Sequence, residues 1–243
     1  IVEWLPEELR RRGGGSGENE NGAEADASRP PSAEAVRDAL LAVDARLLAL
    51  SAAEGGWNDG ATALLAILST RQMQLAQVGD SQAALCSAYG AEWLCPQHRI
   101  GTASEDARLE ALGAVIEDGR LVGDGCAVAV TRSLGDAGMK TGSGSGLIAE
   151  PEVSNHPVSP ADECLILGCD GLWDVMEAEE AWDVAARAGK GKGPTGWDYA
   201  AAASALVTSA LDRKTGDNVS VVVIGLRKPR VAKPHPRSRV VAS

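Results

Sequence analysis

The chain has 243 residues, enough for one large domain or two small ones, and its apolar share of 44% is ordinary for a globular protein. A formal net charge of −11 argues against nucleic acid as a partner, and no apolar stretch approaches the length of a membrane span. Its five cysteines are odd in number and form no Cys-x-x-Cys pair, which predicts reduced thiols and a cytoplasmic or nuclear location. We also see no signal peptide, and we expect a monomer that binds neither nucleic acid nor membranes.

Two helices are predicted at the start, separated by a segment with little to bury. Residues 1–12 place apolar side chains on one helical face, and the glycines from Gly13 end that helix. Residues 13–31 consist largely of Gly, Ser, Asn and Glu, which predicts a disordered acidic insertion. A longer helix begins after Pro31, with Ser32 as its N-cap and apolar residues at helical spacing: Val36, Leu40, Val43, Leu47 and Leu48.

Three short strands follow, at residues 62–69, 73–78 and 83–88. The connections are so short that we expect an antiparallel meander. Asp80 ends the second strand, although taken alone it is most simply a turn aspartate. His98, in the next loop, has no Cys or acidic partner at metal spacing and is expected to face solvent or to cap the backbone.

The middle of the chain alternates turns with short elements. A capped helix is predicted from Ser104 to Leu109, ended by Gly113, and two Asp-Gly pairs predict hairpin turns at 118–119 and 124–125. The second of these turns leads into a strand at 127–131. Residues 140–146 are predicted to form a flexible loop before extended structure resumes at Glu150.

The stretch from Leu165 to Met176 is the most informative part of the sequence. A short apolar run, typical of a buried strand, ends at Asp170 and is followed by an Asp-Gly turn signal. A carboxylate fixed there is costly unless it is paired or bound to a metal, although a plain turn is the simpler interpretation of these residues alone. A helix with acids in its first turn is predicted from Glu177.

The remaining chain is predicted to hold one more helix and one more strand. The helix spans 197–213, and Asp217 then opens the strand at 219–224. Residues 227–243 are basic and contain no acid, which most simply indicates a disordered tail, with a localisation or docking signal as the alternative.

Asp80, Asp170 and Asp217 share one property, because each adjoins the end of an apolar strand. If the strands at 164–169 and 219–224 are antiparallel neighbours, Asp170 and Asp217 reach the same sheet edge. Carboxylates gathered there repel one another unless cations intervene, and all-oxygen ligation suits Mg²⁺ or Mn²⁺. Two such ions support hydrolysis of phosphate esters by a metal-activated water.

The same residues lie in segments that resemble a known family. The sequence Cys169-Asp170-Gly171-Leu172-Trp173-Asp174 resembles the Asp-Gly-x-Trp-Asp signature of the metal-dependent protein Ser/Thr phosphatases, the PP2C (PPM) family. Four further segments resemble other motifs of that family, and all five stand in the family's order. They are Val78-Gly79-Asp80-Ser81, Val130-Thr131-Arg132-Ser133-Leu134-Gly135-Asp136, Glu150-Pro151-Glu152-Val153 and Asp217-Asn218-Val219-Ser220-Val221.

The resemblance implies a fold and a set of site residues. The expected fold is α+β: a four-layer α-β-β-α sandwich, in which two antiparallel sheets pack face to face with helices outside. Asp170 and Asp217 would be ligands of a first metal ion, and Asp80, with Asp170, would match the position of a third, weaker ion. Asp174 would hold water bound to the metal. The resemblance gives Arg132 and Asp136 structural roles, and we assign no catalytic side chain.

Several family motifs have no counterpart in this sequence. Missing are an Arg that binds phosphate, a Glu-Asp pair and an Asp-Gly-His-Gly-Gly motif whose Asp bridges both metals; Gln82 also replaces the usual Arg of the Gly-Asp-Ser-Arg motif. Because the chain opens on Ile1, we interpret residues 1–226 as a PP2C-like domain lacking its first metal-binding motifs. The alternative hypothesis is a catalytically dead pseudophosphatase that acts as a protein-interaction module.

The resemblance therefore predicts hydrolysis of phosphoserine and phosphothreonine in phosphoprotein substrates by the complete protein, with Mg²⁺ or Mn²⁺ and without a covalent phosphoenzyme. The 243-residue chain alone is expected to be essentially inactive, because it lacks the bridging aspartate. It is also expected to bind Mn²⁺ at most weakly.

Overall fold

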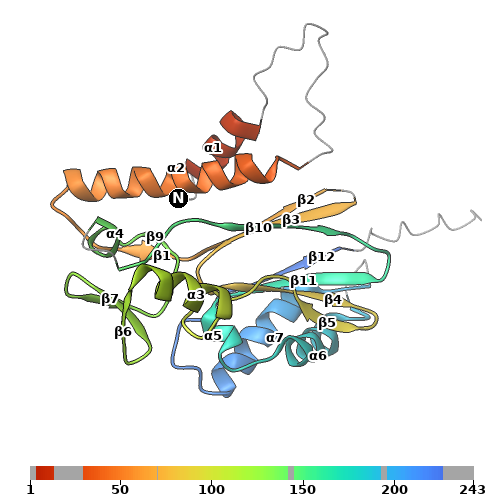
Figure 1. Ribbon diagram of the computed structural model, residues 1–243. Helices are drawn as coiled ribbons and strands as arrows, with labels where there is room; N and C mark the ends of the chain where they lie inside the picture. The colour runs from red at the N-terminus through yellow and green to blue at the C-terminus, as the bar shows by residue number, and fades with distance from the viewer. Residues whose placement is uncertain (1–3, 14–29, 70, 142–144, 193–195, 227–243) are drawn as a thin grey trace, which may run out of the picture.

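Two antiparallel sheets lie face to face, and helices cover the outer face of each (Figure 1). This computed structural model describes residues 4–13, 30–69, 71–141, 145–192 and 196–226. The two facing sheets and the helices outside them confirm the four-layer sandwich predicted from the sequence. The insertion predicted at 13–31 falls mostly outside the described residues, and the tail predicted at 227–243 falls wholly outside them, so both stay predictions. No helix in the described ranges combines the length and apolarity that a membrane span requires.

The first helical layer consists of α1 (Trp4–Gly13) and α2 (Ala33–Ala53), as the sequence predicted. Ser32 Oγ accepts a hydrogen bond from Ala35 N at 3.1 Å and so caps α2. The buried face of α2 packs on the sheet ordered β10-β3-β2, which consists of β10 (Glu152–Pro157), β3 (Gln72–Val78) and β2 (Ala63–Leu68). Alternate residues of β3 point to α2 or to the other sheet, as strand geometry requires.

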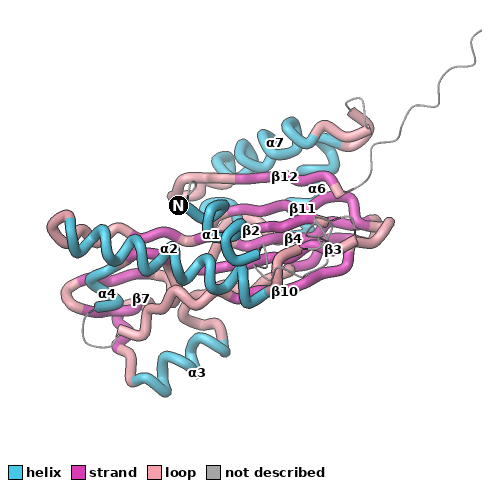
Figure 2. Tube along the Cα trace, turned by 90° about the horizontal axis from the view of Figure 1, so that it is seen from above, coloured by secondary structure: helices cyan, strands magenta, loops and turns pink. Residues whose placement is uncertain are grey.

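The second sheet is ordered β12-β11-β4-β5, as the view from above shows in part (Figure 2). Its strands are β12 (Val221–Gly225), β11 (Asp162–Gly168), β4 (Gln82–Ser87) and β5 (Gly90–Trp93). The outer face is covered by α5 (Asp170–Trp173), α6 (Ala178–Gly189) and α7 (Tyr199–Asp212).

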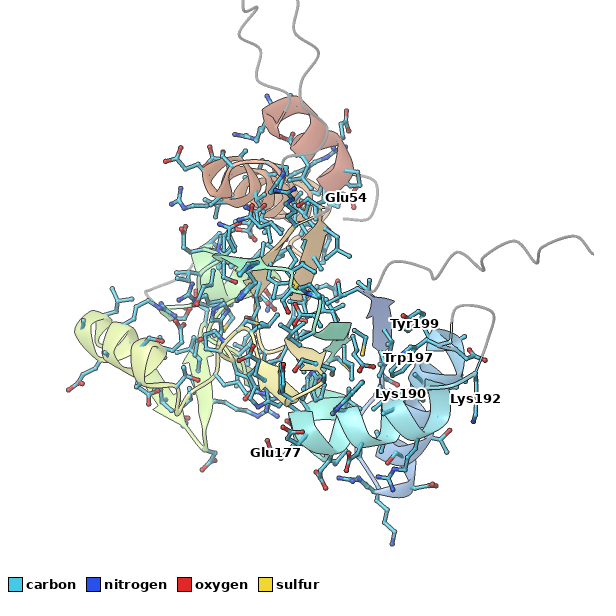
Figure 3. All side chains as sticks on the ribbon, turned by 90° about the vertical axis from the view of Figure 1, so that its right-hand side faces the viewer. Glu54, Glu177, Lys190, Lys192, Trp197 and Tyr199 are labelled. Carbon is cyan, nitrogen blue, oxygen red and sulfur yellow. The ribbon has the colours of Figure 1, made fainter. Side chains whose placement is uncertain are left out.

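Aromatic side chains pack this outer helical layer together in a chain without phenylalanine. Trp182 stacks on Trp197 with ring centroids 5.7 Å apart, and Trp197 stacks on Tyr199 at 5.5 Å. Trp197, Tyr199 and Lys190 are seen on the α6–α7 side of the molecule in Figure 3. The Lys190 ammonium lies 5.5 Å from the centre of the Trp182 ring.

The predicted three-stranded meander is wrong in its third strand. β2 and β3 pair as expected, but β4 pairs with β11 and β5 in the opposite sheet. The chain crosses between the sheets at residues 79–81. Gly79 has φ +104°, and a Cβ there would lie 2.3 Å from Thr62 Cγ2, so only glycine suits this crossing. The crossing carries Asp80 to one end of the sandwich.

Short elements gather at that end of the sandwich, as Figure 1 shows for α3 and the β6–β7 hairpin. The elements are α3 (Ala103–Leu112), β6 (Val115–Glu117), β7 (Arg120–Gly123), β8 (Cys126–Val128), α4 (Ala137–Thr141) and the paired β1 (Gly60–Ala61) and β9 (Leu134–Gly135).

Both predicted Asp-Gly turns in this region are confirmed, with positive φ at Asp118, Gly119, Asp124 and Gly125. Two other predictions need correction. The strand predicted at 127–131 is the shorter β8, and the loop predicted at 140–146 begins inside α4, with residues 142–144 outside the described ranges.

Candidate active site

Strand register brings the predicted aspartates to one end of the second sheet. Gly168 at the end of β11 is paired with both Val221 of β12 and Gln82 of β4. Residues just after β11, just before β12 and just before β4 therefore share one edge. These residues include Asp170, Asp217 and Asp80, and the predicted antiparallel pairing of the two strands beside Asp170 and Asp217 is confirmed.

Asp170 is the first residue of α5, and the predicted Asp-Gly turn is wrong. Gly171 is helical and has no positive φ. Glycine is required there for another reason, because a Cβ would lie 2.2 Å from the Asn218 carbonyl oxygen. The bare backbone of α5 thus contacts the loop before β12, and this close approach sets Asp170 beside Asp217. Asp170 Oδ1 also accepts a hydrogen bond from Gly171 N at 2.9 Å.

Trp173 fixes α5 to the sheet. Its indole Nε1 donates to the carbonyl oxygens of Gly168 at 2.9 Å and Gln82 at 3.1 Å, which lie on β11 and β4. Its ring packs edge-on against Trp93 of β5, with centroids 4.7 Å apart. Asp174 follows at the end of the same helical turn, and its N–H donates to Asp170 O at 2.8 Å. The aspartate at 174 is therefore held on the same face as Asp170.

The residue that sequence reasoning missed is Arg99. Its Nε donates to Asp80 Oδ2 at 2.6 Å, its Nη1 to Asp174 Oδ1 at 2.7 Å, and its Nη2 to Asp170 Oδ2 at 3.3 Å. One guanidinium thus joins three of the four predicted aspartates. The fourth, Asp217, is exposed, and its Oδ1 accepts a hydrogen bond from Asn218 N at 2.7 Å.

His98 holds Arg99 in place. Of the two alternatives predicted for it, exposure to solvent is wrong and capping of the backbone is confirmed. The side chain is 1% exposed. Its Nδ1 accepts a hydrogen bond from Gly79 N at 3.1 Å, while His98 N donates to Gly79 O at 3.1 Å. Burial and the charge of Arg132 lower the pKa of His98 to about 4, so the ring is neutral at pH 7. The pair of bonds ties the segment bearing Arg99 to the turn bearing Asp80.

Neither His98 nor Arg99 has a direct signal of its role in the sequence. They lie 18 and 19 positions after Asp80, in a stretch without a recognisable element, and only the tertiary fold brings the two segments together. A basic residue next to a histidine was the one available hint, and it is too common to be specific.

The electrostatics of this end are dominated by carboxylates. Burial raises the pKa of Asp170, and the neighbouring charges of Asp80 and Asp217 raise it further, against the opposing effect of Arg99. Burial opposes the charge on Arg99, but its bonds to Asp174 and Asp80 outweigh that cost and raise the arginine pKa. One cation therefore serves several anions, and the site keeps a surplus of negative charge.

The donor types fit a hard divalent cation, but their arrangement does not form a ready site. Carboxylate oxygens are the ligands that Mg²⁺ and Mn²⁺ prefer. Across the described ranges, however, no three acidic, His or Cys side chains are grouped closely enough to hold an ion. The Arg99 guanidinium lies where the carboxylates converge. The assignment of Asp80, Asp170, Asp174 and Asp217 to metal binding thus stays a prediction.

Arg132 and Asp136, which the resemblance assigned to structural roles, have partners that fit such roles. Arg132 bonds to the buried Glu105 through Nε and Nη2 and donates to Glu150 O at 2.9 Å. Asp136 accepts a hydrogen bond from Ser133 Oγ at 2.5 Å and has a φ of 51°.

Comparisons with known proteins point to one family. The family model described as "Protein phosphatase 2C" matches residues 18–219. A rice (Oryza sativa subsp. japonica) protein, "Probable protein phosphatase 2C 57", is 36% identical over 211 residues, covering 84% of this chain and 56% of its own length. "Probable protein phosphatase 2C 22" of Arabidopsis thaliana is also 36% identical over 211 residues, covering 84% of this chain and 50% of its own length. The chain thus spans about half the length of these relatives.

Solved structures agree with the fold. A C. elegans sex determining protein superposes with a TM-score of 0.71 and 26% identity, covering 93% of this chain and 51% of the other. A serine-threonine phosphatase 2C from Toxoplasma gondii superposes with a TM-score of 0.68 over 79% of this chain and 66% of the other. The second pair is only 23% identical and supports the architecture alone.

Proposed function

Because this chain belongs to the protein phosphatase 2C family, we propose that the protein hydrolyses phosphoserine and phosphothreonine in phosphoprotein substrates. The observation that carries the proposal is the gathering of Asp80, Asp170, Asp174 and Asp217 at one sheet edge, within the span that matches the family. The names of the relatives give no support to the alternative of an inactive interaction module.

The family is metal-dependent in general, and we propose Mg²⁺ or Mn²⁺ as the cofactor of this protein. Asp170 and Asp217 would supply oxygen ligands to one ion, Asp80 with Asp170 to a weaker one, and Asp174 would hold bound water. Such ions supply an activated water and neutralise phosphoryl oxygens. A phosphate ester carries negative charge, so the surplus of carboxylates repels it unless cations balance that charge.

Residues of the chain hold the carboxylates of the candidate site in position. The strand end of β11, the helical turn of α5 and the close contact of Gly171 with Asn218 fix Asp170 relative to the loop that carries Asp217. The two hydrogen bonds between His98 and Gly79 fix the turn that carries Asp80 from the other side. These contacts set the spacing of the carboxylates to which cations and substrate would bind.

The test is turnover of a phosphothreonine peptide by the protein expressed from its complete coding sequence. We expect release of inorganic phosphate that requires Mn²⁺ or Mg²⁺, and a rate at least 100-fold lower in Asp170→Asn. Asp183→Asn makes the same chemical change on an exposed position of α6 and should leave the rate unchanged. Turnover that survives EDTA, or a trapped phosphocysteine, would contradict the proposal.

We also propose a location and an assembly state for the protein. All five cysteines are free in the structure, which agrees with a reducing compartment such as the cytosol or nucleus. We propose a monomer, which light scattering at micromolar concentration would test by its mass.

A further inference from the structure

The side chain of Arg99 is placed unusually for a surface arginine. Each of its three guanidinium nitrogens donates to a different carboxylate: Nε to Asp80, Nη1 to Asp174 and Nη2 to Asp170. The arginine side chain is 24% exposed, and Asp80 beneath it is 5% exposed. Its fork of donors can serve several oxygens at once, which a point charge such as lysine cannot do in a fixed geometry.

Arg99 occupies one oxygen of each of three carboxylates that could serve a metal ion. Arg99 takes Asp80 Oδ2, Asp174 Oδ1 and Asp170 Oδ2, and the other oxygen of Asp170 accepts from Gly171 N. A divalent ion at the centre of these carboxylates would need the space and the oxygens that the guanidinium holds. Guanidinium keeps its charge at every pH that proteins tolerate, so it cannot leave by losing a proton. The Arg99 side chain can therefore release these oxygens only by changing its conformation.

The geometry divides the contacts of Arg99 into an inner and an outer set. The backbone is fixed, because His98 is bonded twice to Gly79 and Arg99 bridges to Val130. The inner contact is the 2.6 Å bond to buried Asp80. The outer contacts reach Asp170 and Asp174, whose side chains are 33% and 51% exposed. An ion arriving from solvent meets the outer contacts first and can replace them while the backbone stays in place.

We propose that Arg99 is an internal counter-cation that competes with divalent metal ions for Asp80, Asp170 and Asp174 and thereby lowers the metal affinity of this site. The proposal rests on the proposed function, because it takes these aspartates as the family's metal-binding end. Metal loading then becomes an exchange of one cation for another and requires Arg99 to swing outward. Arg99 thus affects metal binding through the carboxylates that it pairs with.

The test is a Mn²⁺ titration by calorimetry on protein expressed from its complete coding sequence, comparing wild type with Arg99→Met. We expect at least tenfold tighter Mn²⁺ binding in Arg99→Met, because the competing cation is gone while the aspartates remain. Arg99→Lys keeps a positive charge without the three-way fork and should bind Mn²⁺ with an affinity between the two. The matched control is Arg37→Met on α2, which makes the same change in net charge at an arginine paired with Glu150, and it should stay within twofold of wild type.

Two further variants make the result decisive. In the double variant Asp170→Asn with Arg99→Met, the gain in affinity should disappear, because the contested ligand is gone. Circular dichroism establishes that each variant is folded, and if Arg99→Met does not fold, the Arg99→Lys comparison decides alone. Equal or weaker Mn²⁺ binding in both Arg99 variants would overturn the proposal.

The same protein separates this inference from the proposed function. If wild type hydrolyses a phosphopeptide with Mn²⁺ but Arg99 variants bind Mn²⁺ no more tightly, only the competition is wrong. If no variant shows metal-dependent hydrolysis, the proposed function itself fails.

Discussion

Two of the arginine–carboxylate clusters among the described residues are built in opposite proportions. In the first, the single carboxylate of Glu105 accepts hydrogen bonds from Arg132, Arg108 and Thr131 and is 0% exposed. In the second, the single guanidinium of Arg99 faces three carboxylates and is partly open to solvent. We name them the Glu105 cluster and the Arg99 cluster.

The difference shows what each cluster can do. Burial opposes the charge of Glu105, but the bonds from Arg132, Arg108 and Thr131 outweigh it and hold its pKa at about 2. The Glu105 cluster therefore has its charges satisfied and contributes to folding. The Arg99 cluster has more anions than its one cation balances, and Asp170 there has a raised pKa. A cluster of that kind lowers the stability of the fold but is suited to binding cations.

Glu105→Gln should produce the largest loss of stability. The substitution leaves the half-buried charges of Arg132 and Arg108 without their anion, and breaking a buried pair in this way costs about 3–5 kcal/mol. The free energy of unfolding, measured by urea denaturation, should fall by that amount. Glu110→Gln on the exposed side of the same helix is the control and should change it by less than about 0.5 kcal/mol. Equal effects would show that Glu105 is not the centre of a structural cluster.

As the pH falls, protonation of His98 should lower the free energy of unfolding before protonation of Glu105 does. The folded pKa of His98 is about 4 and the ordinary value is 6.5, so the unfolded chain binds the proton first as pH falls. Stability from this group is complete above pH 6.5 and is lost as pH falls to about 4, by about 3 kcal/mol in total. Glu105 contributes its own loss only below its ordinary pKa of 4.5.

The measurement is the free energy of unfolding between pH 7 and pH 4.5. His98→Asn should be less stable than wild type at pH 7 and should lose less stability across this range. The same slope in both proteins would mean that His98 titrates normally. Charged groups near His98 are Arg132, Glu105, Arg108 and Glu152, and they are unchanged in this variant.

Gly171→Ala should move α5, which carries Asp170, away from the loop that carries Asp217. The added Cβ would lie 2.2 Å from the Asn218 carbonyl oxygen, so α5 and the loop before β12 must move apart. Overpacking of this kind costs about 1–3 kcal/mol of unfolding free energy. Gly216→Ala is the control, because nothing lies within 4 Å of its Cβ position and its φ is not positive, although it adjoins Asp217. If both substitutions cost the same, the close contact does not position Asp170.

Asp174→Asn should have the smallest effect on stability. Its side chain is 51% exposed and belongs to the cluster with surplus negative charge. Loss of one such ion pair changes the free energy of unfolding by less than about 1 kcal/mol. A loss as large as that of Glu105→Gln would erase the distinction between the two clusters. Urea denaturation at low salt is the appropriate measurement, because salt screens exposed pairs.

Individual helices and strands were predictable because their signals are local, whereas their arrangement in four layers was predicted from the family resemblance. Apolar spacing and the Ser32 cap predicted α2, and the apolar run before Asp170 predicted β11. The passage of the chain from β3 in one sheet to β4 in the other was not predictable. A three-residue connection can join two strands of one hairpin as well as two strands in different sheets. The deciding factor is tertiary: β4 finds its partner in β11, which lies about 80 residues further along the chain.

Asp80, Asp170 and Asp217 were predictable for the same reason, since each adjoins a strand end, whereas Asp174 was predicted only from the family resemblance. Their neighbours were not. Arg99 reaches Asp80 and Asp174 across separations of 19 and 75 residues, and no local pattern encodes either contact. Asp-Gly at 170–171 predicted a turn, whereas Gly171 serves to admit the backbone of Asn218. The sequence thus identified the aspartates, and the structure identified Arg99 as their counter-cation.

The account's central claim is that the Asp170 end of the sandwich accepts a divalent cation. Calorimetric titration of the 243-residue chain with Mn²⁺ tests it most directly, together with Asp170→Asn and the exposed control Asp183→Asn. The account predicts weak binding of Mn²⁺ that Asp183→Asn retains and Asp170→Asn abolishes. Mn²⁺ binding of equal strength in wild type and Asp170→Asn would contradict it.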